Sequence, residues 1–266
     1  MSRNGGVLVL VVLLVAVGCA NRGPVALRGP AQDVVRAAAG RTMAAGGAHV
    51  AVSVGADLAG QGVVDLGAAT AELAFARTGT QAHLDDHFDV VAIGASQWVR
   101  ASAGGSWVRG TPRAVTAAVH ARVTPLDTLL VRPGLGTDLA FLRGATKVFA
   151  YGGQEVRGVN TYRYSFLVDL NVAIADSPAA DRPALQAAAD AIGPVVWPAD
   201  VWLDFGGRVR RLQMAENPFA HTTTTKANLL ITQDGNYLAL TNIEFFDFGI
   251  PVAITPPSAN QAVEAT

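Results

Sequence analysis

This sequence has a single cysteine, few charged side chains and no apolar run long enough to span a membrane. Cys19 is the only cysteine in 266 residues, which excludes an intramolecular disulfide and a cysteine-based metal site. Only 15% of the residues are charged, whereas 50% are hydrophobic, a low charge content for a chain of this size. The excess of apolar side chains requires a large core, a cavity or contact with a membrane.

Neither sign of charge is in excess. Lys and Arg number 20 and Asp and Glu number 21, for a formal net charge of -1. Domains that bind nucleic acid are usually strongly basic, and polybasic membrane patches concentrate lysine and arginine. The composition therefore predicts no nucleic-acid partner and no polybasic membrane patch.

Motifs for catalysis are also missing. The Gly-x-Ser-x-Gly elbow of α/β-hydrolases does not occur, and the glycines at residues 134–136 lack the lysine of a phosphate-binding loop. Asp200 and Asp204 alternate with apolar residues, which predicts the solvated face of a strand rather than an acid–base pair. His83 and His87 have a spacing that zinc ligands use on a helix, but their place before a strand favours a polar turn. We therefore expect no enzyme activity, no cofactor and no metal site.

The first nineteen residues have the layout of a bacterial lipoprotein signal peptide. Arg3 supplies the basic start, residues 7–17 form an apolar run, and small residues precede Cys19. This run is too short for a transmembrane helix, which takes about 20 residues. We expect residues 1–18 to be removed and Cys19 to be acylated, for example with palmitate, which would anchor an extracytoplasmic domain to the cell membrane. An ordinary secretory signal that merely contains Cys19 is the alternative.

The remaining pattern predicts one α+β domain over residues 31–255, preceded by a tether at 19–30 and followed by a flexible tail at 256–266. Apolar residues with helical spacing predict helices between residues 30 and 46 and between 124 and 133, and over 138–143 and 181–192. Strands are predicted from period-two alternation, with a hairpin turn at Gly206 and Gly207. The predicted strands are 49–54, 61–66, 71–77, 88–93, 97–100, 146–151, 154–156, 161–168, 200–205, 208–214, 226–232 and 237–246.

Four segments together resemble the LolA-like lipoproteins of actinobacteria, the family that includes LppX and LprG. They are residues 139–145 (LAFLRGA), 153–164 (GQEVRGVNTYRY), 200–212 (DVWLDFGGRVRRL) and 246–257 (FDFGIPVAITPP). The resemblance implies a strongly curved antiparallel β-sheet, a half-barrel, whose concave apolar face is covered by helices. In several relatives that face holds acyl chains. Residues 217–225 depart from the family pattern.

The resemblance implies a non-catalytic protein that binds or carries lipids or other apolar ligands in the half-barrel. Ligand pockets are typically apolar clefts with few polar groups, so the apolar faces of the predicted strands are the candidate lining. The same residues would also suit a filled core. A cavity-free domain that binds an envelope protein is therefore the alternative, with no partner protein indicated. The candidate lining residues are Leu73, Phe75, Val91, Ile93, Tyr162, Tyr164, Phe166, Val201, Leu203, Leu229 and Ile231.

Overall fold

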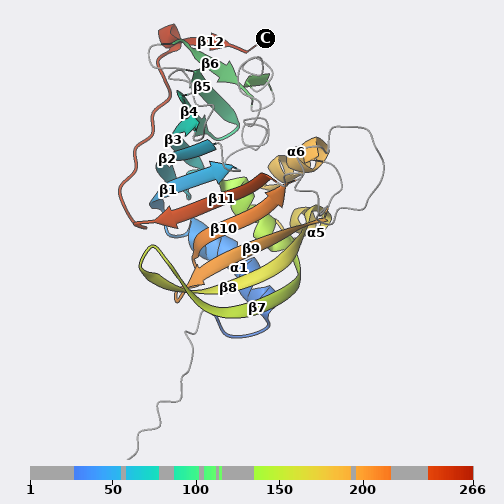
Figure 1. Ribbon diagram of the computed structural model, residues 1–266. Coiled ribbons are helices and arrows are strands. Elements are labelled where there is room, and N and C mark those ends of the chain that lie inside the picture. The colour runs from blue at the N-terminus through green and yellow to red at the C-terminus, as the bar shows by residue number, and fades with distance from the viewer. Residues whose placement is uncertain are drawn as a thin grey trace, which may run out of the picture.

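The protein folds around one large open β-sheet (Figure 1). The computed structural model describes residues 27–54, 58–77, 87–101, 105–111, 114–115, 135–192, 196–216 and 239–265. Within them the 12-stranded sheet has the order β12-β6-β5-β4-β3-β2-β1-β11-β10-β9-β8-β7. The strands are β1 (Gly47–Val54), β2 (Leu58–Asp65), β3 (Thr70–Arg77), β4 (His87–Ile93), β5 (Ser96–Ala101), β6 (Trp107–Gly110), β7 (Ala145–Val156), β8 (Val159–Asp169), β9 (Val196–Asp204), β10 (Val209–Glu216), β11 (Ala239–Phe246) and β12 (Ala262–Glu264).

All strand pairings are antiparallel except that of β12 with β6, which is parallel. The sheet is therefore mixed and it does not close into a barrel. The predicted α+β class, with an open curved sheet and a few helices, is confirmed. The described helices are α1 (Ala31–Met43), α4 (Leu135–Ala140), η3 (Phe141–Gly144), α5 (Leu170–Ala175), α6 (Arg182–Ile192) and η4 (Ala259–Gln261).

Alternation along the strands gives the sheet an apolar inner face and a mixed outer face. In β1, Val50, Val52 and Val54 are buried and alternate with half-buried positions. The register aligns Val52 with Gly60 of β2 and with Ile243 of β11. Because a strand turns successive side chains to opposite faces, these aligned positions form one continuous inner surface.

The helices cover the inner face behind β8, β9 and β10 (Figure 1). α1 buries its apolar stripe of Val34, Val35 and Ala38 and contacts β7, β10, α4 and η3. It ends before Gly46, whose φ of 74° is a left-handed conformation that glycine adopts without strain. α5 begins at Asp169, whose side chain accepts hydrogen bonds from two backbone N–H groups of the first turn.

The predicted elements are found with some changes. The predicted Gly206–Gly207 turn joins β9 to β10. β7 is one strand with two irregularities where two strands were predicted, and β12 forms where a polar tail was expected. Cys19, the helix predicted between residues 124 and 133 and the strand at 226–232 lie outside the described residues. No helix in the described part of the chain combines the length and apolar character needed to cross a bilayer.

Candidate functional site

Helices and side chains fill the inner face of the sheet over β7 to β10. The short helix η3 contacts α1, α5 and β8, and its Phe141 and Leu142 are fully buried. The ring of Phe141 meets Trp197 of β9 edge-on, with centroids 5.6 Å apart. This half is a packed protein core. Five of the predicted lining residues lie on its strands, namely Tyr162, Tyr164, Phe166, Val201 and Leu203.

The inner face of β2 to β5 is equally apolar, yet none of the described helices makes a main packing contact with it. Phe75 of β3 and Phe88 of β4 stack on this face with ring centroids 4.8 Å apart. Gly60 of β2 lies under Phe75, and a Cβ at Gly60 would clash with the Phe75 ring. The result is an apolar layer whose side chains are themselves buried, at 0–8% exposed. Its buried side chains are Leu58, Leu73, Phe75, Phe88, Val90 and Val99.

Two buried polar atoms near one end of the inner face, Oγ1 of Thr241 and Nε1 of Trp197, have no hydrogen-bond partner among the described residues. Their residues are only 0% and 5% exposed, and the register of β9, β10 and β11 places them at the same end of the sheet. Burial, with a smaller contribution from Tyr162, raises the pKa of the Tyr164 phenol, which therefore stays neutral. Neutral donors of this kind suit the carbonyl or hydroxyl groups of a mostly apolar ligand.

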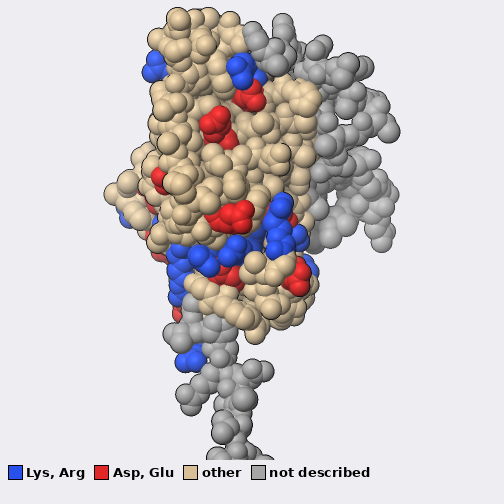
Figure 2. Space-filling view, turned by 90° about the vertical axis from the view of Figure 1, so that its left-hand side faces the viewer, with Lys and Arg blue, Asp and Glu red and all other residues tan. Residues whose placement is uncertain are grey.

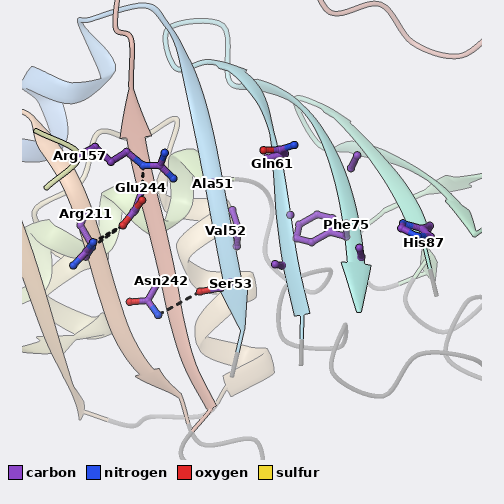
Figure 3. Close-up of a pocket in the computed structure, with 14 residues that line it drawn as sticks. Ala51, Val52, Ser53, Gln61, Phe75, His87, Arg157, Arg211, Asn242 and Glu244 are labelled. Carbon is purple, nitrogen blue, oxygen red and sulfur yellow. Dashed lines mark hydrogen bonds and ion pairs between the residues drawn. The ribbon is translucent and has the colours of Figure 1, made fainter. Parts of the chain in front are cut away.

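The outer face carries an open trough of about 790 Å³ that crosses β11, β1, β2, β3 and β4 (Figure 3). Small side chains form much of its lining. One wall is an ion-pair cluster in which Arg157 and Arg211 both contact Glu244, and His87 lies on the opposite side. The small lining residues are Ala51, Ser53, Ala59, Gly60, Ala74 and Ala76.

Glu244 is held ionised in this wall. Burial by itself would raise the pKa of its carboxyl, but hydrogen bonds and charge from Arg157 and Arg211 lower the pKa below its usual value. Arg211 also lies over the ring of Trp202, 5.3 Å from its centroid. These contacts fix the guanidinium groups in place.

Asp204 departs from its predicted position on a solvated face. Its side chain is only 4% exposed and contacts both Arg208 and Arg210. Burial would raise the pKa of this carboxyl, but hydrogen bonds from Arg208 and the charges of Arg208 and Arg210 lower it. The prediction failed because the arginines that cover the carboxylate follow the Gly206–Gly207 turn and fold back over it.

The remaining predicted lining residues lie elsewhere. Val91 belongs to a small apolar cluster on the outer face with Trp98 and Trp107, and Ile93 packs against that cluster. Leu229 and Ile231 lie outside the described residues, as does His83. Among the side chains that the structure describes, no three His, Cys, Asp or Glu residues gather as a metal ion would require.

Solved structures that cover most of this chain include those of LprF and LppX. The chain is similar to LprF from Mycobacterium bovis, with 15% identity and a TM-score of 0.48 over 89% of this chain and 100% of that one. For the lipoprotein LppX of Mycobacterium tuberculosis the identity is 14% and the TM-score 0.45, over 84% and 99%. A domain from Vibrio parahaemolyticus described as an outer membrane lipoprotein-sorting protein is 8% identical, with a TM-score of 0.31 over 84% and 93%.

The resemblance to the LppX–LprG group drawn from the sequence motifs is confirmed in that LprF and LppX are structural neighbours over most of both chains. At these identities the likeness is one of fold. No protein-family model and no curated protein sequence matches the chain.

Proposed function

We propose that this protein is a lipid-anchored lipoprotein of the cell envelope that binds lipids or other hydrophobic molecules and carries them without catalysis. The observation that carries the proposal is the unequal covering of the inner face. The described helices pack over β7 to β10, whereas the apolar surface around Phe75 and Phe88 has none of them as a main contact. Such a surface suits the flexible apolar chain of a lipid.

The energetics favour this use of the surface. Removing apolar area from water yields about 25 cal/mol per Å², so burying about 200 Å² of an acyl chain yields about 5 kcal/mol before ordering costs. The unpartnered donors of Thr241 and Trp197 would orient a polar group of the ligand. The affinity would be moderate, which suits a protein that takes up a lipid and releases it again.

The predicted signal peptide supports the location. Acylation at Cys19 would place the domain outside the cytoplasm, beside the membrane from which a lipid is taken. Lipoproteins are also among the structural neighbours. We propose that both the anchor and the extracytoplasmic location hold for this chain.

A second function, binding an envelope protein, is favoured by one feature of the edge strand β7. Phe149 and Tyr151 of this strand are 64% and 65% exposed. Beside them lies a depression of about 420 Å³ lined in part by Phe149, Leu167 and Pro198. Exposed aromatic side chains next to a hollow are common at protein interfaces. This reading requires no lipid in the half-barrel.

Lipid analysis of the purified protein separates the two functions. Every described helix and strand lies between Ala31 and Glu264, so a chain that begins at Ala20 contains the whole described fold. We expect native purification of this chain, followed by solvent extraction and mass spectrometry, to yield a lipid in near-stoichiometric amount. A folded chain with no bound lipid would overturn the carrier function and favour the interaction function.

A matched pair of variants locates the binding surface. Phe75→Ala and Phe141→Ala each remove a buried phenylalanine, the first from the inner face over β2 to β5 and the second from the half that the described helices cover. Both are expected to reduce stability, because large-to-small substitutions in a core cost about 3–5 kcal/mol. Only Phe75→Ala should reduce the lipid bound per folded molecule. Equal lipid content in both variants would contradict this placement.

A further inference from the structure

Two carboxylates on the outer side of the sheet, buried Asp204 and half-buried Glu244, each contact two arginines. Asp204 contacts Arg208 at 2.9 Å and Arg210 at 3.0 Å, and Glu244 contacts Arg157 and Arg211, both at 2.6 Å. Each cluster therefore has a net charge of about +1 while its carboxylate is ionised. We call these four arginines, Arg157, Arg208, Arg210 and Arg211, the arginine belt.

Three of the four arginines of the belt face solvent, and their carboxylate partners lie beneath them. The side chains of Arg157, Arg208 and Arg211 are 46%, 37% and 34% exposed, whereas that of Arg210 is 13% exposed. Those of Asp204 and Glu244 are 4% and 17% exposed. Asp247, between Phe246 and Phe248, is 63% exposed and pairs with His49, so an approaching anion meets the three exposed guanidinium groups together with this carboxylate.

The fold gathers the belt at one side of the molecule. The β7–β8 turn, the β9–β10 turn and the end of β11 lie together at the left in Figure 1, and Figure 2 shows a band of basic side chains across this side. Aromatic rings contact two arginines of the belt. Arg157 lies 4.2 Å from the ring centroid of Phe246, and Arg210 lies 4.7 Å from that of Phe248.

An exposed aromatic residue lies in the same turn as Arg208. Phe205, in the turn that precedes Arg208, is 51% exposed, and Tyr162 contacts it with ring centroids 6.0 Å apart. Arginine beside exposed aromatic side chains is typical of surfaces at the membrane–water interface, where the cation contacts phosphate and the ring enters the headgroup region.

The predicted anchor adds a limit on distance, and here the inference rests on the proposed function. The structure describes the chain from residue 27 onward. Residues 20–26, which follow the acylated Cys19, can span at most about 25 Å when fully extended. One face of the domain must then lie close to the bilayer surface.

We propose that the arginine belt is that face, and that it docks on an anionic bilayer with its guanidinium groups on lipid phosphates and Phe205 at the headgroup level. Guanidinium groups suit this role because they bind phosphate oxygens bidentately and stay charged. Docking would hold the domain in one orientation while it exchanges lipid with the membrane. The four arginines of the belt come from the β7–β8 turn, the β9–β10 turn and the start of β10.

Binding to vesicles tests the proposal. The chain from Ala20 is mixed with vesicles of phosphatidylcholine alone, or of phosphatidylcholine with phosphatidylglycerol, and bound protein is measured by co-sedimentation. We expect binding to the anionic vesicles only, weakened by salt. Arg157→Gln and Arg208→Gln should each weaken it about fivefold, as expected for the loss of one cation near an anionic surface. Both variants leave each buried carboxylate one arginine, so the fold is retained.

Arg109 provides the matched control. It is 49% exposed and contacts Glu264 one to one at 3.2 Å, away from the belt. Arg109→Gln removes the same charge and should leave vesicle binding unchanged. Equal binding to both kinds of vesicle, or equal losses in all three variants, would overturn the docking proposal.

The two proposals fail separately. A chain that co-purifies with lipid but ignores anionic vesicles refutes the docking face and leaves the carrier function standing. A chain that needs the belt for vesicle binding but holds no lipid refutes the carrier function and supports the docking face.

Discussion

Phe75 stacks face to face on Phe88, with ring centroids 4.8 Å apart and ring planes inclined by 6°. The stack lies on the inner face of the sheet and depends on the strand beside it. Gly60 pairs with Phe75 across β2 and β3, and its lack of a side chain leaves room for the ring. The apolar packing on the inner face of β2 to β5 therefore depends on a glycine as well as on large side chains.

Gly60→Ala is expected to destabilise the protein by about 1–3 kcal/mol, because the new Cβ enters the space of the Phe75 ring. Urea unfolding followed by circular dichroism measures the change. Gly40→Ala is the control, since Gly40 lies in α1 with open space around it. That variant should gain about 0.5–1 kcal/mol from helix propensity. A neutral Gly60→Ala would show that Phe75 does not lie against β2.

Thr42→Val is expected to cost about 1–3 kcal/mol, because it leaves a buried backbone N–H without a partner. The Thr42 hydroxyl donates to the carbonyl of Ala38 at 2.7 Å and accepts from the N–H of Val209 at 2.9 Å. It thereby ties the end of α1 to β10. Thr42→Ser keeps the hydroxyl and should be clearly more stable than Thr42→Val in the same unfolding assay. The reverse order would mean that the methyl group, and not the hydrogen bond, holds this contact.

Stability should fall in acid because of the two carboxylates beneath the arginine belt. The pKa values of Asp204 and Glu244 are lowered in the folded protein, so folding favours their ionised forms. Their contribution is complete above the unfolded pKa values, about 3.9 for Asp and 4.3 for Glu. It is lost as the pH falls through the lower folded values.

Asp204→Asn tests this origin of the acid sensitivity. The variant should be less stable at neutral pH, because Arg210 loses its carboxylate partner. It should also lose less stability than the unaltered chain between pH 5 and the acid limit of the assay. Unfolding by urea at a series of pH values measures the free energy of unfolding at neutral pH and its decrease in acid for both chains. Parallel pH profiles for the two chains would assign the acid sensitivity to other groups.

Cys19→Ala is expected to release the protein from the membrane fraction, because it removes the thiol that would be acylated. Fractionation of cells followed by immunoblotting measures the distribution. Arg28→Gln, which lies beyond the signal sequence, is the control and should leave the protein in the membrane fraction. Retention of Cys19→Ala in that fraction would contradict the lipid anchor.

Local patterns were enough to predict much of the sheet. β1 was predicted because apolar residues recur at every second position, as in Val50, Val52 and Val54. β6 and β12 were missed because they have four and three residues, too few for a period to emerge. Gly152 and Gly153 made β7 look like two strands, although both pair with β8, and the irregularities lie between Thr146 and Phe149 and between Ala150 and Gly152.

Alternation predicts which side chains share a face but not what covers that face. Tyr164 and Phe75 both belong to apolar faces. Tyr164 lies in the half that the described helices cover, whereas Phe75 lies over β2 to β5, where none of them makes a main contact. Only tertiary packing separates them. The arginine belt could not be predicted either, because it too forms only through tertiary folding. Arg157 and Arg208 are far apart in a sequence with a net charge of -1, and the turns of the sheet bring their charges to one side.

The first strand of the domain sits in the middle of the sheet, between β2 and β11. His49 at its start lies 3.0 Å from Asp247, 198 positions further along the chain. The two halves of the sheet are therefore joined only when nearly the whole polypeptide is present. Contacts this distant in sequence slow folding, so a chain that folds from its amino end would complete its sheet only once residues 239–246 are present.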